Sequence, residues 1–272
     1  MRAPAVPGTT IRAMGNPGSS SGELKIAVFI DLENLAVGVG DAKNAKFDIR
    51  LVLNRLIEKG DVVVKKAYAD WGVYQAYKRA LHEAVIELIE MPGSKLTGKN
   101  SSDIKMVVDA LELCYTKPHV DAFALVSGDS DFSPLVSKLR ENNKHIIGVG
   151  VKSSTSPLLI DNCDEFIFYE DLVEKPRRVE RRGLSDLPQK KREAFQQLLD
   201  AASALQRENR ELYSSLVKDT MKRKQPQFSE EYHGYASFSR LLEDAQANRL
   251  IVLRRDPKSG TYVIDEILDE GA

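Results

Sequence analysis

The chain contains 272 residues, of which 42% are hydrophobic and 29% are charged. This composition is typical of soluble globular proteins, and the length suits two domains. No segment approaches the ~18 to 20 consecutive apolar residues of a membrane-spanning helix, and Cys114 and Cys163 provide neither a disulfide framework nor a zinc-binding spacing. We therefore expect a cytoplasmic protein without a membrane segment. Residues 1–23 are rich in Pro, Gly and Ser and lack an apolar core, so we expect a disordered leader rather than a secretory signal.

The formal net charge of −1 conceals an uneven distribution of charge along the chain. From Glu174 to Lys258, 19 basic residues stand against 13 acidic ones, whereas residues 1–173 hold 20 basic and 23 acidic residues. Residues 174–186 combine many charges with Pro and Gly and show no apolar periodicity, which is typical of a linker. The sequence thus predicts an acidic domain at 24–173, a basic linker at 174–186 and a small basic domain at 187–268.

Short apolar runs alternate with helical periodicity through the first domain. Such β-α-β repetition predicts an α/β fold with a doubly wound parallel sheet and helices on both faces. In the helix that begins after GKN, the spacing of Ile104, Val107, Val108 and Leu111 predicts the buried face. Strands are expected at 26–30, 61–69, 84–90, 122–127, 144–151 and 165–169, and helices at 49–60, 73–83, 101–115, 133–143 and shortly after Pro157.

Acidic residues stand where the chain leaves two of these strands or enters a helix. Asp31 follows the first strand, Asp129 and Asp131 follow the strand at 122–127, and Asp103 lies in the first turn of the helix at 101–115. Ligands bind beyond the carboxyl ends of the strands in such sheets, so we expect these side chains to converge. Converging carboxylates repel one another unless a cation lies among them, and oxygen ligands suit Mg²⁺ or Mn²⁺. We predict a catalytic metal site formed by these four aspartates.

Each acid also has a purely structural interpretation. Asp103 and Asp131 would each stabilise a helix N-terminus by ~0.3 to 1 kcal/mol. Asp31 is harder to explain in this way, because an acid directly after a buried strand loses its hydration. The hypothesis therefore depends on the joint occurrence of the acids. Four further residues are supporting candidates: Asn34, Ser127, Ser130 and Asp109. In the structural interpretation, Asn34 is a turn residue and the hydroxyls of Ser127 and Ser130 satisfy loop amides. Asp109 is expected to face solvent or a basic neighbour.

The blocks FIDLEN, GKNSSDIKMVVDAL and ALVSGDSDFSPLVSKLRENNKHIIGVG resemble, in order and spacing, the three signature blocks of NYN (LabA-like) domains, a branch of the PIN-like nucleases. The resemblance spans residues 24–172. It implies an (endo)ribonuclease that depends on Mg²⁺ or Mn²⁺ and leaves a 5′ phosphate and a 3′ hydroxyl. The family's acidic positions fall on Asp31, Asp103, Asp129 and Asp131, and its asparagine falls on Asn34. This domain carries more acidic than basic residues, whereas RNA binding favours the opposite balance. Three basic residues flank Asp103, namely Lys95, Lys99 and Lys105. They either contact phosphates or form a solvated rim.

Two other acid-dependent folds fit the sequence less well. A haloacid-dehalogenase phosphatase requires a second aspartate two residues after the first, where this chain has Glu33. A Toprim-like fold accommodates Glu33 with Asp129 and Asp131 but leaves Asp103 unexplained.

The second domain is expected to contain three helices, at 187–205, 210–224 and within 226–250, followed by a hairpin at 250–264. This order is typical of a winged helix, and PQFSEEYHGYASFSRLLE followed by LIVLRR resembles the OST-HTH (LOTUS) domain, which implies RNA or a protein partner. We expect Phe228, Tyr235 and Phe238 to pack beneath the wing. The predicted phosphate contacts are Lys222, Arg223, Lys224, Arg254, Arg255 and Lys258.

Together these patterns predict a metal-dependent ribonuclease whose second domain binds RNA. The alternative is a non-catalytic adapter that uses a PIN-like fold to hold RNA or a protein. The complete acidic set favours the enzyme.

Overall fold

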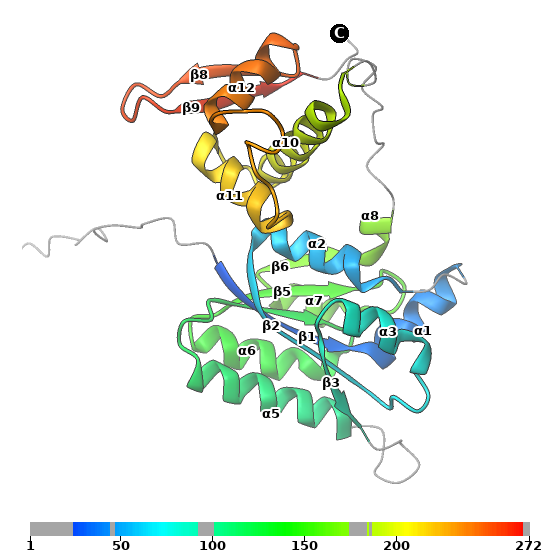
Figure 1. The fold of residues 1–272 in the computed structure, drawn as a ribbon. Helices are drawn as coiled ribbons and strands as arrows, with labels where there is room; N and C mark the ends of the chain where they lie inside the picture. Colours follow the sequence, from blue (N-terminus) through cyan, green and yellow to red (C-terminus); the bar gives the residue numbers. More distant parts are fainter. Residues whose placement is uncertain (1–23, 44–46, 92–100, 174–183, 185–186, 269–272) are drawn as a thin grey trace, which may run out of the picture.

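The computed structural model describes residues 24–43, 47–91, 101–173, 184 and 187–268. They form two units, each with its own hydrophobic core (Figure 1). The N-terminal unit comprises residues 24–173 and the C-terminal unit comprises Leu184 with residues 187–268. The predicted leader and nearly all of the predicted linker lie outside the described residues. In the described part of the chain, no helix is long and apolar enough to cross a membrane.

The N-terminal unit is built on six parallel strands in the order β3-β2-β1-β4-β5-β6. The chain first builds outward from β1 to β3 and then returns to the other side of β1, so the winding direction changes between β1 and β4. This confirms the predicted parallel α/β sheet. The strands are β1 (Leu24–Asp31), β2 (Gly60–Ala69), β3 (Glu87–Glu90), β4 (Ala122–Val126), β5 (His145–Gly150) and β6 (Glu165–Phe168).

Helices cover both faces of the sheet because the central strands are apolar on both sides. In β1, Ile26, Val28 and Ile30 face one core, and Ala27 and Phe29 face the other. Helices α1 (Leu32–Lys43), α2 (Ile49–Lys59), α3 (Gln75–Glu83) and α8 (Tyr169–Val173) pack on the first face, and α5 (Ser101–Thr116), α6 (Ser133–Glu141) and α7 (Pro157–Asn162) pack on the second. Figure 1 shows α2 above the sheet and α5 and α6 below it.

Helix α1 follows β1 without a loop, in a segment where the apolar pattern did not lead us to expect a helix. Glycines lower helix propensity in this segment, but Leu32, Leu35 and Val39 are buried against the sheet and stabilise the helix. A Cβ on Gly38 would lie 2.5 Å from Ser154 Oγ, so a close approach to the loop after β5 favours glycine there.

Helix α5 packs through a different face from the predicted one. Ile104 and Val108 are 62% and 51% exposed, whereas Met106, Ala110 and Cys114 are buried. Val107 and Leu111 are only partly buried. The prediction of the buried face was therefore wrong for Ile104 and Val108.

The C-terminal unit contains three helices and a three-stranded antiparallel sheet in the order β7-β9-β8. Strand β7 begins within the segment expected to be the second helix, so that helix starts only at Ser214. Phe228 and Phe238 are buried and Tyr235 is partly buried against the same core, as expected. The elements are α10 (Gln189–Arg207), β7 (Leu212–Tyr213), α11 (Ser214–Lys224), α12 (Phe238–Ala247), β8 (Ile251–Arg255) and β9 (Tyr262–Ile267).

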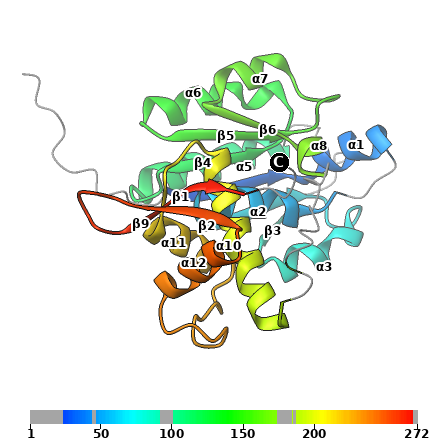
Figure 2. The same ribbon diagram turned by 90° about the horizontal axis from the view of Figure 1, so that it is seen from above.

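The C-terminal unit contacts the N-terminal unit through α10 and α11, which lie against α2. Viewed from above, both helices lie over α2 and the neighbouring strands (Figure 2). The hairpin of β8 and β9 lies at the end of the C-terminal unit that points away from α2 (Figure 1).

Candidate functional site

Asp31 and Ser127 meet at the carboxyl ends of the two central strands. Ile30 pairs with Val126 across β1 and β4, so the residues that follow them emerge side by side. Asp31 Oδ2 accepts a hydrogen bond of 3.0 Å from the Ser127 hydroxyl, and Asp31 Oδ1 accepts one of 3.2 Å from the backbone N–H of Asn34. The pair lies where the winding direction changes, which is where ligands bind in open α/β sheets.

The loop after β4 is fixed by side chains from both strands. Asn34 Oδ1 accepts a hydrogen bond of 2.9 Å from the Gly128 backbone N–H, and Ser127 Oγ accepts one of 3.2 Å from the Asp129 N–H. A Cβ on Gly128 would lie 2.9 Å from both the Ser154 carbonyl oxygen and Thr155 Oγ1. The loop is thus held between α1 and the segment after β5. As expected, Ser127 satisfies a loop amide.

Asp129 has a structural role in addition to its place in the site. Its Oδ1 accepts a hydrogen bond of 2.9 Å from the Asp131 backbone N–H and so caps the 3₁₀ turn η1 (Ser130–Phe132). Asp131 itself is exposed and Ser130 is half-buried. The stabilisation of a helix N-terminus that was predicted for Asp131 is therefore supplied at η1 by the side chain of Asp129.

Burial dominates the electrostatics of Asp31, whose residue surface is only 7% exposed. Burial raises the pKa of Asp31 to about 7. The hydrogen bonds from Asn34 and Ser127 lower this pKa, whereas the nearby charges of Asp103 and Glu33 raise it further. Asp103 on α5 therefore lies close enough to Asp31 to repel its charge. Among the described residues, both hydrogen-bond donors to Asp31 are neutral, so neither brings a positive charge to this carboxylate.

Sequence reasoning missed two residues near Asp31, namely Asp70 and Tyr74, and considered Glu33 only for a Toprim-like fold. Glu33 Oε1 accepts a hydrogen bond of 2.9 Å from the backbone N–H of Asp70, the residue that follows β2. The pKa of Tyr74 is raised by burial and by the charges of Glu33, Asp31 and Asp70. The strand-end rule could have found Asp70, since it directly follows an expected strand, but nothing local marks Tyr74.

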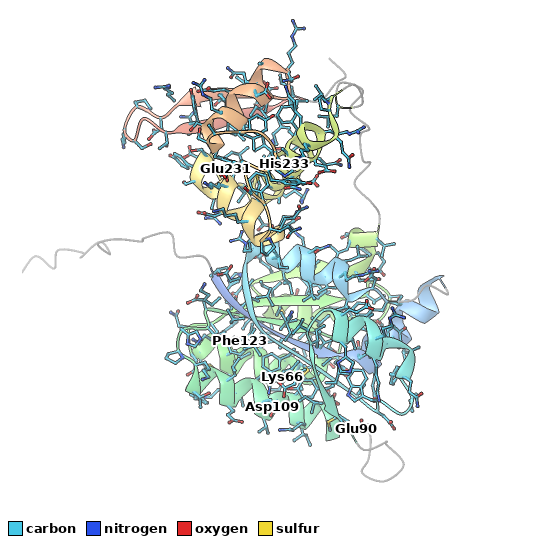
Figure 3. All side chains as sticks on the ribbon, viewed as in Figure 1. Lys66, Glu90, Asp109, Phe123, Glu231 and His233 are labelled. Atoms are coloured by element: carbon cyan, nitrogen blue, oxygen red, sulfur yellow. The ribbon has the colours of Figure 1, made fainter. Side chains whose placement is uncertain are left out.

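Asp109 anchors α5 to the sheet rather than facing solvent. Its carboxylate accepts hydrogen bonds of 2.8 Å from the Tyr68 hydroxyl and 2.6 Å from Lys105 Nζ, and Lys66 Nζ lies 3.8 Å away (Figure 3). Burial raises the pKa of Asp109, but these donors outweigh it and hold the pKa below its ordinary value. The expected basic neighbours are present, although Asp109 is buried. Lys105, a predicted phosphate contact, is the partner of this anchor.

The structure brings some of the predicted metal ligands to one edge but does not assemble them around an ion. Among the described residues, no three His, Cys, Asp or Glu side chains are arranged to hold a metal. Asp31 and Asp129 lie at the ends of adjacent strands, and Asp103 is near Asp31. The four-aspartate metal site stays a prediction.

The predicted phosphate contacts are dispersed. Arg223 and Lys224 contact α2 of the N-terminal unit, and Lys222 beside them is exposed. On the distant hairpin, Arg254 pairs with Asp265 and Glu211, and Arg255 contacts the Tyr262 hydroxyl at 3.2 Å. Lys258 is exposed at the hairpin turn. Lys95 and Lys99 lie outside the described residues.

The NYN domain family matches residues 25–170, which is more than half of the chain. The chain belongs to the NYN family. NYN domains form part of the PIN-like nuclease superfamily. The matched range covers the parallel sheet except its first residue, Leu24, and includes Asp31, Asp103, Asp129 and Asp131.

The chain is similar to several known proteins. It is 32% identical over 146 residues to protein MJ0482 of Methanocaldococcus jannaschii, covering 54% of this chain and 55% of that protein. The chain therefore spans about half the length of this relative. It is 26% identical over 174 residues to the low amplitude and bright protein LabA of Synechococcus elongatus, covering 57% of this chain and 91% of LabA.

A solved structure has the same domain. The crystal structure of VPA0982 from Vibrio parahaemolyticus, titled as a protein of unknown function, matches with a TM-score of 0.50 and 29% identity. The match covers 57% of this chain and 98% of VPA0982.

Proposed function

We propose that this NYN protein is a metal-dependent ribonuclease whose C-terminal unit binds RNA. Membership of a PIN-like nuclease family supports hydrolysis of a phosphodiester bond. The observation that carries the proposal is the buried carboxylate of Asp31, which lies at the winding switch beside Ser127 and feels the charge of Asp103. A buried carboxylate whose hydrogen-bond donors are neutral is costly to the fold, and such groups cluster at functional sites.

The donors at this edge fit a hard divalent cation. Asp31, Asp103, Asp129 and Asp131 offer only oxygen atoms, the ligands that Mg²⁺ and Mn²⁺ prefer. When bound, such a cation would stabilise negative charge on a phosphodiester and favour deprotonation of a nearby water.

The surrounding residues hold these carboxylates in place. Ser127 and the backbone of Asn34 orient Asp31 through its two oxygens. The side chain of Asn34 fixes Gly128 and thereby the backbone that carries Asp129. The Asp109 anchor fixes α5, which carries Asp103 in its first turn. Asp129 and Asp131 are joined through the capped turn, so a shift of one moves the other.

We propose that the C-terminal unit is a winged-helix domain of the LOTUS type. Its antiparallel sheet and its aromatic core around Phe228 and Phe238 support this assignment. Lys222 and Lys258 are exposed and available to RNA phosphates, and Arg254 and Arg255 lie on the wing.

The decisive test incubates the purified protein with labelled RNA in Mn²⁺, in Mg²⁺ and in EDTA. We expect cleavage in either metal and none in EDTA. Asp129→Asn should abolish cleavage while the protein stays folded, because the amide still offers an oxygen to the Asp131 N–H. Calorimetric titration should show weakened Mn²⁺ binding by this variant.

The matched control is Asp161→Asn, which removes an exposed carboxylate on α7. Its cleavage rate and Mn²⁺ affinity should equal those of the unsubstituted protein. Equal Mn²⁺ affinity in the Asp129 variant would contradict the proposed metal site. RNA binding without cleavage under every metal condition would instead identify the chain as a non-catalytic adapter.

A further inference from the structure

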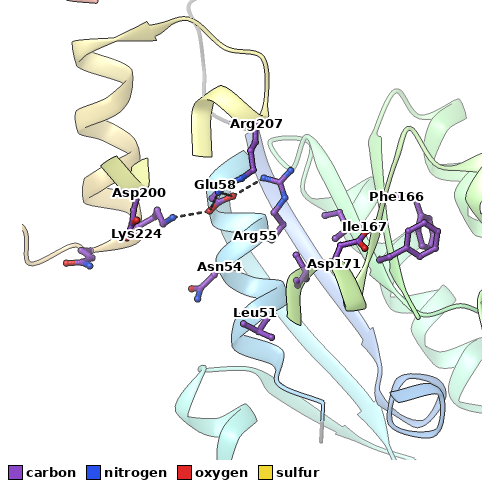
Figure 4. Close-up of a pocket in the computed structure, with 13 residues that line it drawn as sticks. Leu51, Asn54, Arg55, Glu58, Phe166, Ile167, Asp171, Asp200, Arg207 and Lys224 are labelled. Carbon is purple, nitrogen blue, oxygen red and sulfur yellow. Dashed lines mark hydrogen bonds and ion pairs between the residues drawn. The ribbon is translucent and has the colours of Figure 1, made fainter. Parts of the chain in front are cut away.

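The contact between the two units centres on the carboxylate of Glu58 in α2. Arg207 lies 2.9 and 3.0 Å from its two oxygens, and Lys224 lies 3.0 Å from Oε1. Arg55 of the same helix pairs with Oε2 at 2.9 Å. The Glu58 side chain is 8% exposed, and Figure 4 shows the cations grouped around it. One buried carboxylate thus binds two cations of the C-terminal unit.

A second buried ion pair reinforces this contact. The Lys59 side chain is 4% exposed, and its Nζ lies 2.7 Å from Glu208 of the C-terminal unit and 2.5 Å from Glu165 of β6. Arg55 also pairs with Glu208 at 2.6 Å. Acids and bases of each unit therefore pair with those of the other, and breaking one partner leaves a buried charge behind.

The basic end of α11 also contacts the end of α2. Arg223 Nε donates to the Ile57 carbonyl at 2.7 Å, and a second nitrogen of the same group donates to the Glu58 carbonyl at 3.4 Å. These carbonyls lie in the last turn of α2, where the helix dipole is negative and favours a cation. Two of the cations predicted to hold RNA are therefore engaged by the N-terminal unit.

This contact lies at the edge of the sheet opposite the candidate site. Lys59 directly precedes β2 and Glu165 begins β6, so the cluster faces the amino ends of the strands. Asp31 ends β1 at the carboxyl edge. The docked unit therefore leaves the candidate site uncovered but engages Arg223 and Lys224.

We propose that docking on α2 and RNA binding by the basic end of α11 exclude one another, with the Glu58 carboxylate held in the place of an RNA phosphate. This inference rests on the proposed RNA-binding function of the C-terminal unit. Carboxylate and phosphate are both oxyanions that Arg and Lys bind through charge-assisted hydrogen bonds. Burial raises the pKa of Glu58, but Lys224 and Arg207 outweigh it and keep the carboxylate charged.

The surroundings of the cluster allow this exchange without unfolding either unit. A cavity of about 720 Å³ lies between the units and is lined by Arg55, Glu58, Arg207 and Lys224 together with apolar side chains of β6. Figure 4 shows these residues around the opening. The cations that hold Glu58 thus border a cavity at the contact rather than the hydrophobic core of either unit. Because only the undocked fraction of the protein binds RNA through α11, docking lowers the apparent affinity by that fraction.

The test measures RNA affinity and the separation of the units in the full chain. The protein carries Asp129→Asn to prevent cleavage, and fluorescence anisotropy with labelled single-stranded RNA gives the affinity. Small-angle scattering gives the radius of gyration with and without RNA. We expect Glu58→Gln to bind RNA roughly tenfold more tightly and to be more extended before RNA is added.

A second variant and a control separate docking from charge. Glu208→Gln removes the partner of Lys59 and Arg55 without touching α11, and it should shift both measurements in the same direction. Glu83→Gln makes the same charge change in an exposed pair with Arg79 on α3 and should shift neither.

The final arm distinguishes failure of this inference from failure of the proposed function. Arg223→Gln with Lys224→Gln should remove the gain in affinity from the Glu58→Gln protein. The double substitution could lower RNA affinity while neither Glu58→Gln nor Glu208→Gln raises it. In that case docking and RNA binding do not exclude one another, but RNA binding by α11 stands. If the double substitution leaves RNA affinity unchanged in both backgrounds, Arg223 and Lys224 do not bind RNA and the exclusion is wrong, whereas cleavage and RNA binding by the wing are judged by their own tests.

Discussion

At the scale of single residues, Asp31 makes the strongest prediction about stability. Folding raises its pKa from 3.8 to about 7 because the side chain is buried. Its contribution to stability is therefore fully present below pH 3.8 and is lost as the pH rises through about 7. Asp31→Asn avoids this loss, and the amide can still accept from the Asn34 N–H and donate to the Ser127 hydroxyl. We expect this variant to be more stable at pH 8 by on the order of 3 to 4 kcal/mol.

Urea unfolding in EDTA, repeated from pH 4 to pH 8, measures this difference. The gain should be near zero at pH 4 and level off above pH 7. Asp161→Asn, at an exposed position, should show no such trend. A gain that is the same at every pH would mean that charge burial at Asp31 is not its cause.

The sequence pointed to Asp31 because the cost of burying an acid after an apolar strand can be judged locally, and the structure does bury this side chain at the strand end. It placed Asn34 near the site but could not show that the Asn34 side chain binds Gly128, 94 residues further on. Nor could it show that Asp129 caps its own turn or that Tyr74 lies beside Asp31. These contacts depend on which loops meet at the sheet edge, and that is decided by the packing of the whole unit.

At the scale of an element, the face of α5 can be tested directly. Met106 is buried against the sheet, so Met106→Ala should destabilise the protein by about 2 to 5 kcal/mol, because it removes apolar packing and leaves a cavity. Ile104 is exposed on the same helix, and Ile104→Ala should change stability by less than about 0.5 kcal/mol. Thermal unfolding of the two variants compares them. Equal destabilisation would mean that both faces of α5 are packed.

Helix α5 shows why periodicity alone could not settle this point. Two apolar stripes run along this helix, and the buried stripe includes Asp109. A charged residue makes a helix face look exposed when only the pattern of apolar residues is considered. Tyr68 and Lys66 on β2 compensate that carboxylate, and their approach to α5 is not visible in the sequence. Strand β7 was missed for a similar reason, since a two-residue strand forms only when β9 pairs with it.

At the scale of the whole molecule, a chain that ends at Val173 should remain folded and cut short RNA. Its two cores, one on each face of the sheet, lie within residues 24–173. It should bind long RNA more weakly, because the basic surplus lies beyond that point. Removing the C-terminal unit should also lower the slope of log affinity against log salt concentration, by ~0.7 for every RNA phosphate that this unit binds.

Anisotropy titrations of long RNA at several salt concentrations check this division of labour. A chain cut after Val173 that keeps the full affinity and the full slope would show that the C-terminal unit serves another partner. The docking of α11 on α2 could not be predicted from the sequence. Pairs such as Lys224 with Glu58 join residues 166 positions apart, and nothing in either segment points to the other.

The position of the docked unit at the amino ends of the strands also gives the molecule a length scale. Strand β1 has eight residues between the docking edge and Asp31, which corresponds to about 26 Å at ~3.3 Å per residue. An RNA with ~3.4 Å between stacked nucleotides needs about eight of them to cover that span. A shorter fragment bound at Asp31 cannot reach the docking edge to displace Glu58 from Lys224, whereas a longer one can. The fold therefore sets a minimum footprint below which a substrate bound at Asp31 cannot release the docked unit.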